Sequence, residues 1–452
     1  MSSTPPPPFE SIRTLQNHLA SGELTARGLL ERCLQTIDAR DSEIHAWVHV
    51  DRDGAIEQAD MLDRERRDGH VCGLLHGIPV GIKDIIDVAG LPTRGGCPSG
   101  RDQPVLEDAC VTARLREAGA IILGKTVTTQ YAGFDPPVTR NPHALDRTPG
   151  GSSSGSAAAV AAGMCPIAIG SQTGGSITRP ASFCGVAGCK PSMGRVSRRG
   201  VIPLADSLDH VGPMAGHVDD LAIVLDVISG PDSGDASTRS TLATRISSQQ
   251  TAIAGRTFQW GLLGGPFLDW AEPVMQAALH RSIERMAGDP GNGSRAELNS
   301  IDWPTEGETL WDNHYDIMAY ETAAVHGEEF DRQPEAFLPK FTSLIEHGRT
   351  VSPSRYAEAR NHQETFRTIA TAMFESAEVL VCAGALGPAP DAGTTGNPSF
   401  NSPWSYLGWP TVSFPLDRDE NGLPLAIQLV GPPNGEELVF RLARACERNL
   451  RR

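Results

Sequence analysis

The sequence predicts an α/β protein in which helices cover both faces of a mixed β-sheet. Three observations support this fold class. From about residue 74, short apolar runs bounded by Gly and Pro alternate with segments of helical spacing, as in strands interleaved with helices. Apolar residues make up 39% of the 452 positions, which is enough to bury a core. The 47 glycines and 34 prolines concentrate at 90–104, 133–155 and 384–410, as they do in long functional loops.

The N-terminal part is predicted to be helical. Residues 1–8 form a Pro-rich, polar tail that we expect to be disordered. Across 9–69, apolar residues such as Leu30, Leu34 and Ile37 recur three and four positions apart, which predicts an N-terminal helical layer. The stretch 55–67 is rich in Asp, Glu and Arg and predicts a more exposed helix.

The remaining elements follow from apolar runs and their spacing. Helices are expected at 108–118 and 154–162, and the segment from about 235 to 375 is expected to be a mostly helical, more polar insertion. Neither a repeat nor a Ser/Gly linker divides the chain, so residues 9–452 are predicted to form a single domain. The expected strands are 78–82, 120–123, 166–170, 379–383, 410–414 and 425–430.

Charge and cysteine usage narrow the class of protein. The 39 basic and 55 acidic residues give a net charge of −16, which disfavours direct nucleic-acid binding and anionic membranes. The nine cysteines are scattered without a C-x-x-C pair, which suits reduced thiols better than disulfides or zinc. The start lacks a basic and apolar leader, and the longest apolar stretch, 157–170, is too short to span a bilayer. We therefore expect a cytoplasmic protein.

Two motifs match known expressions without their physical context. Residues 119–126 fit the P-loop G-x-x-x-x-G-K-T, but the Ala-Ile-Ile-Leu inside it is itself a predicted buried strand. Residues 151–155 fit the G-x-S-x-G nucleophile elbow, for which His210 or His217 would be the partner. That elbow must follow a strand, and residues 141–150 cannot form one. The thirteen histidines show no H-E-x-x-H pattern, so we expect no metal site.

Lys83 is the first residue that packing alone does not predict. It ends an apolar run, and the alternation of a strand places it on the face opposite to Val80 and Ile82. Burial disfavours the charged form of a lysine, and a neutral amine can act as a base. The alternative is a surface lysine paired with Asp84 or Asp87.

Two small-residue loops provide the other candidates. The loop 150–155 leads into an Ala-rich helix that Gly163 ends, and its serines are either helix caps or reactive groups. The loop 170–176 has paired glycines that either form a plain turn or bring backbone amides to a ligand. The helix carries the chain about 15 Å outward and the next strand brings it about 16 Å back. We therefore expect Ser152 and Ser176 to meet beside Lys83, where a proton relay can form.

These stretches resemble the amidase signature family. The resemblance is strong over 74–232, the signature core, and weaker elsewhere. It implies the amidase signature fold, with a mixed sheet between helices. It implies that Ser176 is the acyl-enzyme nucleophile, Ser152 a bridging serine after a cis peptide bond, and Lys83 the base. The oxyanion amides would be those of Thr173, Gly174, Gly175 and Ser176. The matching stretches are 80–84, 119–126, 141–142, 150–155, 173–176, 183–185, 188–191 and 207–214.

The resemblance also implies a reaction. The chain is expected to hydrolyse a carboxamide to an acid and ammonia or an amine, without a metal or organic cofactor. Its partner is expected to be a small-molecule amide, without direct nucleic-acid or membrane contact, and a homodimer is compatible with this function. Arg179 stands three positions after Ser176, which is similar to malonamidase-like members in which the arginine holds a substrate carboxylate. The alternative role for Arg179 is a structural salt bridge.

Other functions stay open at this point. The chain is also similar to the A-type component of the amidotransferase that generates ammonia for transfer-RNA-dependent amidation, in which a partner protein would hold the RNA. A non-catalytic protein on the same fold is the third alternative. We expect the acyl side of the substrate to be lined by the loops 126–140, 310–350 and 384–406. The candidate side chains there, as a group, are Trp311, His314, Tyr320 and Trp404.

Overall fold

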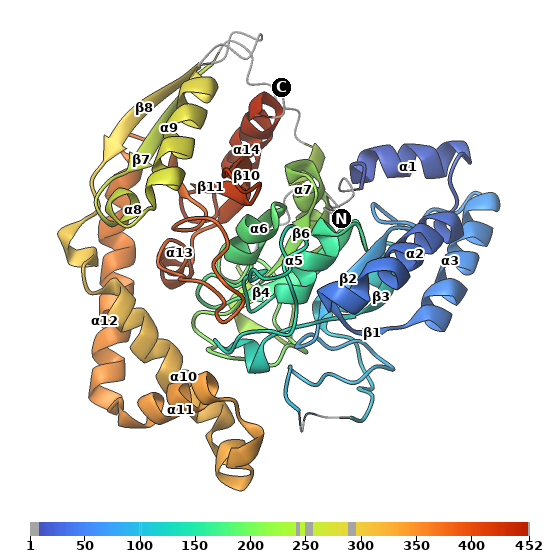
Figure 1. The fold of residues 1–452 in the computed structure, drawn as a ribbon, viewed down its shortest axis with the longest axis horizontal. Helices are drawn as coiled ribbons and strands as arrows, with labels where there is room; N and C mark the ends of the chain where they lie inside the picture. The colour runs from blue at the N-terminus through green and yellow to red at the C-terminus, as the bar shows by residue number, and fades with distance from the viewer. Residues whose placement is uncertain are drawn as a thin grey trace.

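The computed structural model describes residues 9–98, 100, 102–240, 245–248, 256–287 and 295–450. The predicted disordered tail, 1–8, lies outside these residues. Within them, eleven strands form one mixed sheet in the order β1-β3-β2-β4-β6-β5-β10-β11-β9-β7-β8 (Figure 1). The strands are β1 (Trp47–Val50), β2 (Pro79–Lys83), β3 (Ile121–Thr126), β4 (Ile167–Gln172), β5 (Ala187–Lys190), β6 (His210–Ala215), β7 (Thr257–Leu263), β8 (Arg295–Ile301), β9 (Val379–Ala383), β10 (Thr411–Arg418) and β11 (Pro424–Val430).

Helices lie on both faces of this sheet, which confirms the predicted α/β class (Figure 1). Helices α5 and α6 pack on one face, and α7, α9 and α14 pack on the other. The helices are α1 (Ile12–Ser21), α2 (Ala26–Ile44), α3 (Arg52–Arg67), α4 (Cys110–Glu117), α5 (Ser154–Ala161), α6 (Thr178–Cys184), α7 (Val218–Ile228), α8 (Pro266–Asp269), α9 (Pro273–Ala287), α10 (Leu310–Arg332), α11 (Pro339–Thr350), α12 (Pro353–Ala370), α13 (Ser402–Leu407) and α14 (Glu436–Leu450). In the part of the chain that the structure describes, no helix is both long and apolar enough to cross a membrane.

The alternation of side chains divides the core between the two faces. Ile121 and Leu123 of β3 join the cluster around α5, whereas Ile122 joins the cluster on the opposite face. Val80 and Ile82 of β2 also belong to that opposite cluster. Because successive side chains point to opposite faces, the end of β2 directs its last side chain toward α5.

The parallel part of the sheet creates the edge at which the candidate residues meet. Strand β2 pairs in parallel with both β3 and β4, and Ile82 lies opposite Ile169. The carboxyl ends of these strands therefore lie side by side. Lys83 ends β2, and Ser171 lies near the end of β4. In parallel sheets this edge is where ligands bind.

The N-terminal segment contains a strand that the sequence did not predict. Between α2 and α3, β1 pairs antiparallel with β3 at the edge of the sheet. Its Trp47 is buried, and a Cβ on Gly81 would lie 3.0 Å from the indole. The glycine in β2 thus leaves room for this ring. The side chains of β1 are only partly buried, so its pattern carries little apolar signal.

The expectation of a mostly helical segment at 235–375 was incomplete. Helices α8 to α12 lie there, but so do β7 and β8, which extend the main sheet beyond β9. Strand β8 is the edge strand and has the polar sequence Arg-Ala-Glu-Leu-Asn-Ser-Ile. The segment is therefore continuous with the sheet. That residues 9–452 form one domain stays a prediction.

The P-loop match lies in a buried strand, as expected from its apolar sequence. All six residues of β3 are buried. Its Lys125 forms an ion pair with Asp84 at 3.0 Å and donates to Thr93 Oγ1 at 2.9 Å. Burial raises the pKa of Asp84, and the ammonium of Lys125 opposes this effect. A lysine held in this way is not available to a nucleotide phosphate.

Candidate active site

Lys83 lies in the interior and contacts two serines. Its side chain is fully buried, and Nζ donates hydrogen bonds of 2.7 Å to Oγ of Ser152 and 2.7 Å to Oγ of Ser171. It does not pair with Asp84, which is bound to Lys125 instead. The alternative of a surface lysine paired with a neighbouring carboxylate is therefore wrong.

The surroundings of Lys83 favour a neutral amine. Burial lowers its pKa well below the ordinary lysine value, and the negative charge of Asp209 is the opposing influence. Asp209 is itself weakened as a counter-charge, because burial raises its pKa to about 6. A neutral amine has a lone pair that can accept a proton, and an ammonium group has none.

Ser153 joins the two serine loops. Its backbone N–H donates to the carbonyl of Ser176 at 3.3 Å, and its Oγ donates to the carbonyl of Ser171 at 3.1 Å. A Cβ on Gly170 would lie 2.8 Å from this Oγ, so the close approach requires glycine there. The peptide bond between Gly151 and Ser152 is cis. The structure thus brings the loop of Ser152 against that of Ser176.

Ser176 lies just before α6, where Gln172 shapes the backbone. Oε1 of Gln172 accepts hydrogen bonds from the N–H groups of Ile177 at 2.9 Å and Thr178 at 3.0 Å. The first amides of the helix are thereby satisfied. Ser176 keeps 8% of its surface, and its Oγ forms no hydrogen bond with any residue that the structure describes. The hydroxyl is not tied to the protein interior.

The loop 173–176 turns its carbonyl groups into the protein. In a trans peptide, the carbonyl and the following N–H point in opposite directions. Fixing these carbonyls therefore aims the following amides at the opposite side, and the amides of 173–176 donate to no described residue. The carbonyls of Thr173, Gly174, Gly175 and Ser176 accept, in that order, from Nε2 of His314 at 3.0 Å, Oγ of Ser405 at 2.9 Å, the N–H of Arg179 at 2.9 Å and the N–H of Ser153 at 3.3 Å.

His314 reaches this loop from α10. Burial lowers its pKa to about 4, so the imidazole is neutral and donates one N–H to the Thr173 carbonyl. The other aromatic candidates have different surroundings. Trp311 donates to the carbonyl of Ser399, and Trp404 is completely buried. The ring of Tyr320 stacks on that of Tyr356 at 4.3 Å between centroids. Within this group, His314 is the residue that touches the glycine loop.

Arg179 is buried without a carboxylate partner among the described residues. It is 2% exposed, and its Nη2 donates to the carbonyl of Gly151 at 2.8 Å and to Oγ1 of Thr395 at 3.4 Å. Nε and Nη1 are both buried and have no hydrogen-bond partner. Burial lowers the pKa of this guanidinium to about 9. The described residues show no structural salt bridge for Arg179, and two of its donors remain free for an anion.

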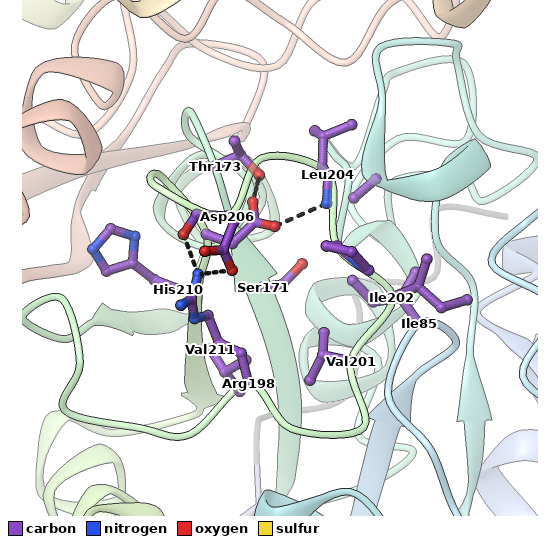
Figure 2. Close-up of a pocket in the computed structure, with 13 residues that line it drawn as sticks. Ile85, Ser171, Thr173, Arg198, Val201, Ile202, Leu204, Asp206, His210 and Val211 are labelled. Carbon is purple, nitrogen blue, oxygen red and sulfur yellow. Dashed lines mark hydrogen bonds and ion pairs between the residues drawn. The ribbon is translucent and has the colours of Figure 1, made fainter. Parts of the chain in front are cut away.

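A cavity of about 140 Å³ borders the lysine site through Ser171. Figure 2 shows Ser171 and Thr173 on one side of it, with Val201 and Ile202 facing them. Thr173 Oγ1 donates to Asp209, whose carboxylate also lines this space. Because Ser171 both accepts from Lys83 and lines the cavity, it connects the buried amine to a space large enough for a few waters.

The nucleophile-elbow alternative does not fit the geometry. The serine at its centre would be Ser153, whose Oγ is bonded to the Ser171 carbonyl. His210 instead hydrogen-bonds the carbonyl of Leu208. Sequence reasoning did not assign roles to Ser153, Ser171, Gln172 or Asp209. The first three lie within or beside the small-residue stretches it selected.

Comparison with known proteins identifies the class. A family model described as Amidase matches residues 28–440. AtzE, which belongs to the 1-carboxybiuret hydrolase of Pseudomonas sp. (strain ADP), is 33% identical over 453 residues, covering 95% of this chain and 96% of the relative. The A-type component of the glutamyl-tRNA(Gln) amidotransferase of Cyanothece sp. (strain PCC 7425 / ATCC 29141) is 33% identical over 484 residues, covering 97% of each chain.

Solved structures agree with these relatives. A chain from a vestigial protein complex, described as revealing the origins of an s-triazine catabolic enzyme, superposes with a TM-score of 0.90 at 31% identity, covering 97% of this chain and 98% of the other. The native peptide amidase from Stenotrophomonas maltophilia has a TM-score of 0.86 at 29% identity, covering 98% and 97%. The fold and these matches define an amide-cleaving hydrolase. The chain belongs to the Amidase family, the amidase signature enzymes.

Proposed function

We propose that this chain hydrolyses a small, carboxylate-bearing carboxamide to an acid and ammonia through an acyl-enzyme on Ser176. The observation that carries the reaction is the 2.7 Å contact between buried Lys83 and Ser152. It joins a base whose pKa is lowered by burial to a serine whose loop is hydrogen-bonded to that of the nucleophile. The relay uses protein groups and water.

The first half-reaction transfers a proton as the new bond forms. Neutral Lys83 accepts the proton of Ser152, and Ser152 accepts that of Ser176 as its Oγ bonds to the amide carbon. The carbonyl π-electrons move to oxygen, and the backbone amides of 173–176 stabilise the resulting oxyanion. The proton returns through Ser152 to the leaving nitrogen. The C–N bond then breaks and ammonia departs.

The second half-reaction repeats these steps with water. A water molecule gives a proton to the relay and bonds to the acyl carbon, and Oγ of Ser176 leaves with that proton. The acid is released and Lys83 is neutral again. A screen of small amides with ammonia release as the readout tests the proposal. We expect one equivalent of ammonia for each acid formed, and the absence of turnover on every amide in the panel would contradict it.

Arg179 supports the carboxylate in the substrate. A buried guanidinium with two free donors is electrostatically incomplete, and a carboxylate accepts two parallel hydrogen bonds from such a group. Arg179 lies three residues after Ser176 and contacts the Gly151 carbonyl, so its charge is at the reaction centre. The relative AtzE is named for a substrate, 1-carboxybiuret, that also has a carboxylate.

Replacing Arg179 by methionine tests this substrate class. We expect KM for an acidic monoamide to rise about 10²-fold, because charge-assisted hydrogen bonds are lost. KM for the matched neutral amide should change little. The melting temperature should stay level or rise, because the variant removes a buried charge without a carboxylate partner. Equal changes in KM for both amides, or a large loss of thermal stability, would support a structural role instead.

His314 provides a second test of the site. We propose that its hydrogen bond to Thr173 fixes the peptide that presents the Gly174 amide. His314→Phe should lower kcat about tenfold with KM nearly unchanged, less than the roughly 10²–10³-fold cost of losing an oxyanion donor outright. His314→Gln keeps an N–H donor and should restore part of the rate.

The pH profile separates a positioning role of His314 from an acid–base role. The pKa of His314 is about 4, so the imidazole stays neutral from pH 6 to 9. His314→Phe should therefore keep the shape of the wild-type profile over this range while lowering its height. A profile that loses its pH dependence in this variant would assign proton transfer to His314 and contradict the positioning role.

Ammonia production for an amidotransferase is the competing function, since relatives at 33% identity have that name. Glutamine also has a carboxylate, so Arg179 fits both substrates. The functions differ in their dependence on partners. We expect the isolated chain, as a monomer or homodimer, to hydrolyse small acidic amides at full rate. Activity on glutamine alone that appears only with two co-purified proteins would instead establish the amidotransferase.

A further inference from the structure

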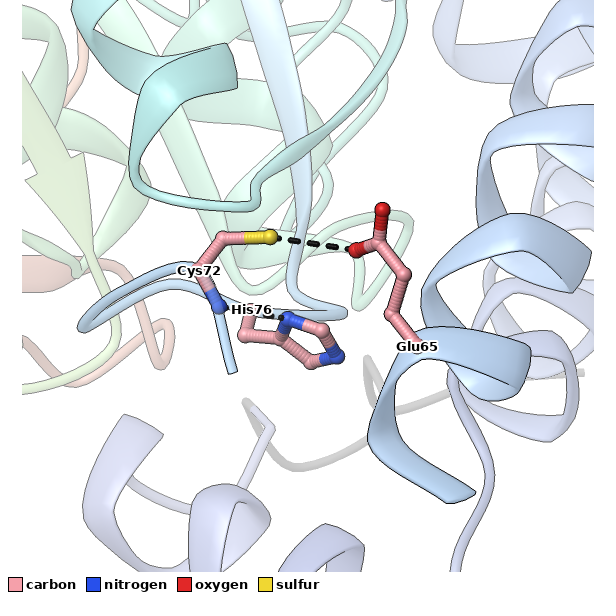
Figure 3. A group of neighbouring side chains, drawn as sticks. All are labelled: Glu65, Cys72 and His76. Carbon is pink, nitrogen blue, oxygen red and sulfur yellow. Dashed lines mark hydrogen bonds between the residues drawn. The ribbon is translucent and has the colours of Figure 1, made fainter. Parts of the chain in front are cut away.

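Three potential metal ligands converge on the opposite end of β2 from Lys83. Glu65 lies near the end of α3, and Cys72 and His76 lie in the loop that leads to β2. Their ligand atoms lie within 4.8 Å of one another (Figure 3). Cys72 Sγ donates to Glu65 Oε2 at 3.1 Å, and the Cys72 N–H donates to His76 Nδ1 at 3.2 Å. The sequence spacing had predicted no metal site.

The orientation of His76 suits a metal ligand. Its Nε2 lies 3.1 Å from the carbonyl of Leu62, which only accepts, so Nε2 has the proton and Nδ1 the lone pair. The ring is 2% exposed and is therefore held in place. In metal sites, a histidine commonly donates its other N–H to a backbone carbonyl in this way. Nδ1 faces Cys72, as coordination with the thiolate requires.

The loop around these ligands is fixed by the neighbouring backbone. The N–H of Leu75 donates to the Ala118 carbonyl at 3.0 Å, and that of Gly77 donates to the Gly119 carbonyl at 2.8 Å. Gly119 has φ of +82°, and a Cβ there would lie 2.7 Å from Cα of His76. The loop is thus packed against the turn after α4, which limits the entropy lost on coordination.

We propose that Glu65, Cys72 and His76 bind a thiophilic divalent cation of the zinc type, with water in the fourth position. Thiolate sulfur, imidazole nitrogen and carboxylate oxygen are the ligand set that zinc takes in proteins. On binding, the Cys72 thiol releases its proton to solvent and forms the metal–sulfur bond. The thiolate and carboxylate balance the charge of the cation. Cys72 is the one exposed thiol of the nine, so the site is open to entry.

The bound ion would be structural, because β2 separates it from the catalytic lysine. His76 precedes this strand and Lys83 ends it, and five strand residues extend about 16 Å. The ion would tie the end of α3 to the start of β2. Binding to the folded chain alone raises the melting temperature with metal concentration. The hydrolytic rate should not depend on the metal.

Cobalt provides a spectroscopic test on the full, untagged chain. After removal of metals with a chelator, Co²⁺ should produce a thiolate-to-cobalt charge-transfer band that saturates at one equivalent and disappears when Zn²⁺ is added. Cys72→Ser should abolish the band, and Glu65→Gln should weaken binding by more than the roughly tenfold cost of losing an outer partner. Zn²⁺ should also slow alkylation of Cys72 in the wild-type chain.

His70→Gln is the matched control. His70 is exposed in the same loop but does not belong to the cluster, so this variant should bind Co²⁺ as the wild type does. Cys72 is also exposed, so Cys72→Ser should fold and keep the wild-type hydrolytic rate. The proposal is overturned if Co²⁺ produces no thiolate band, if the band persists in Cys72→Ser, or if His70→Gln loses binding equally.

Discussion

Ser176→Ala is expected to lower kcat/KM on the order of 10⁴-fold or more, as removal of the nucleophile does in other serine enzymes. The reason is chemical, because alanine cannot form the acyl bond. Ser176 Oγ forms no hydrogen bond with the described residues, so its removal should leave the melting temperature unchanged. Ammonia release and thermal unfolding, measured on the same preparation, check both parts of this prediction.

Ser154→Ala is a matched control in the neighbouring serine loop. Ser154 is buried, and its Oγ donates to the Ser152 carbonyl at 3.4 Å, a long hydrogen bond. We assign it no proton transfer, so this variant should keep most of the activity. Near-wild-type turnover in Ser176→Ala would refute the nucleophile assignment. An equally inactive Ser154→Ala would show that the assay reports loop integrity rather than chemistry.

Lys83→Met is the second substitution with a large expected effect. It fills the buried space without a titratable group, and kcat/KM should fall about 10²–10⁴-fold, the usual contribution of general acid–base catalysis. Ser152 and Ser171 lose a shared partner in this variant, so its folding must be checked by thermal unfolding. The variant should still bind the substrate, because Arg179 is unchanged.

The pH profile gives the sign of the lysine's contribution. Burial lowers the pKa of Lys83, and the base acts only when neutral. Protonation as the pH falls through this pKa should therefore remove activity, and kcat/KM of the wild type should rise toward alkaline pH. Lys83→Met should lose this dependence. A flat wild-type profile from pH 6 to 9, with chemistry limiting the rate, would contradict the base role.

The central strands could be predicted because burial on both faces gives them continuous apolar sequences. The expected strand 379–383 coincides with β9, and the runs at 78–82 and 166–170 became β2 and β4 within a residue or two. The missed strands β1 and β8 lie at the edges of the sheet, and β8 is polar. Their pairing depends on a neighbouring strand that local sequence does not specify.

The candidate site divides in the same way. Lys83 and the glycine loop stand out locally, because a strand ending in lysine and paired glycines are unusual within buried segments. His314 comes from a helix 141 positions away from the carbonyl it holds. The unfilled donors of Arg179 were equally hidden, since any of 55 acidic residues was a potential partner until the fold placed them elsewhere.

Active-site labelling with a fluorophosphonate, located by peptide mass analysis, tests the central claim most directly. The account predicts a single adduct on Ser176, absent from Ser176→Ala and formed far more slowly in Lys83→Met. An adduct on Ser152 or Ser153 instead, or labelling of Ser176→Ala at the wild-type rate, would contradict it.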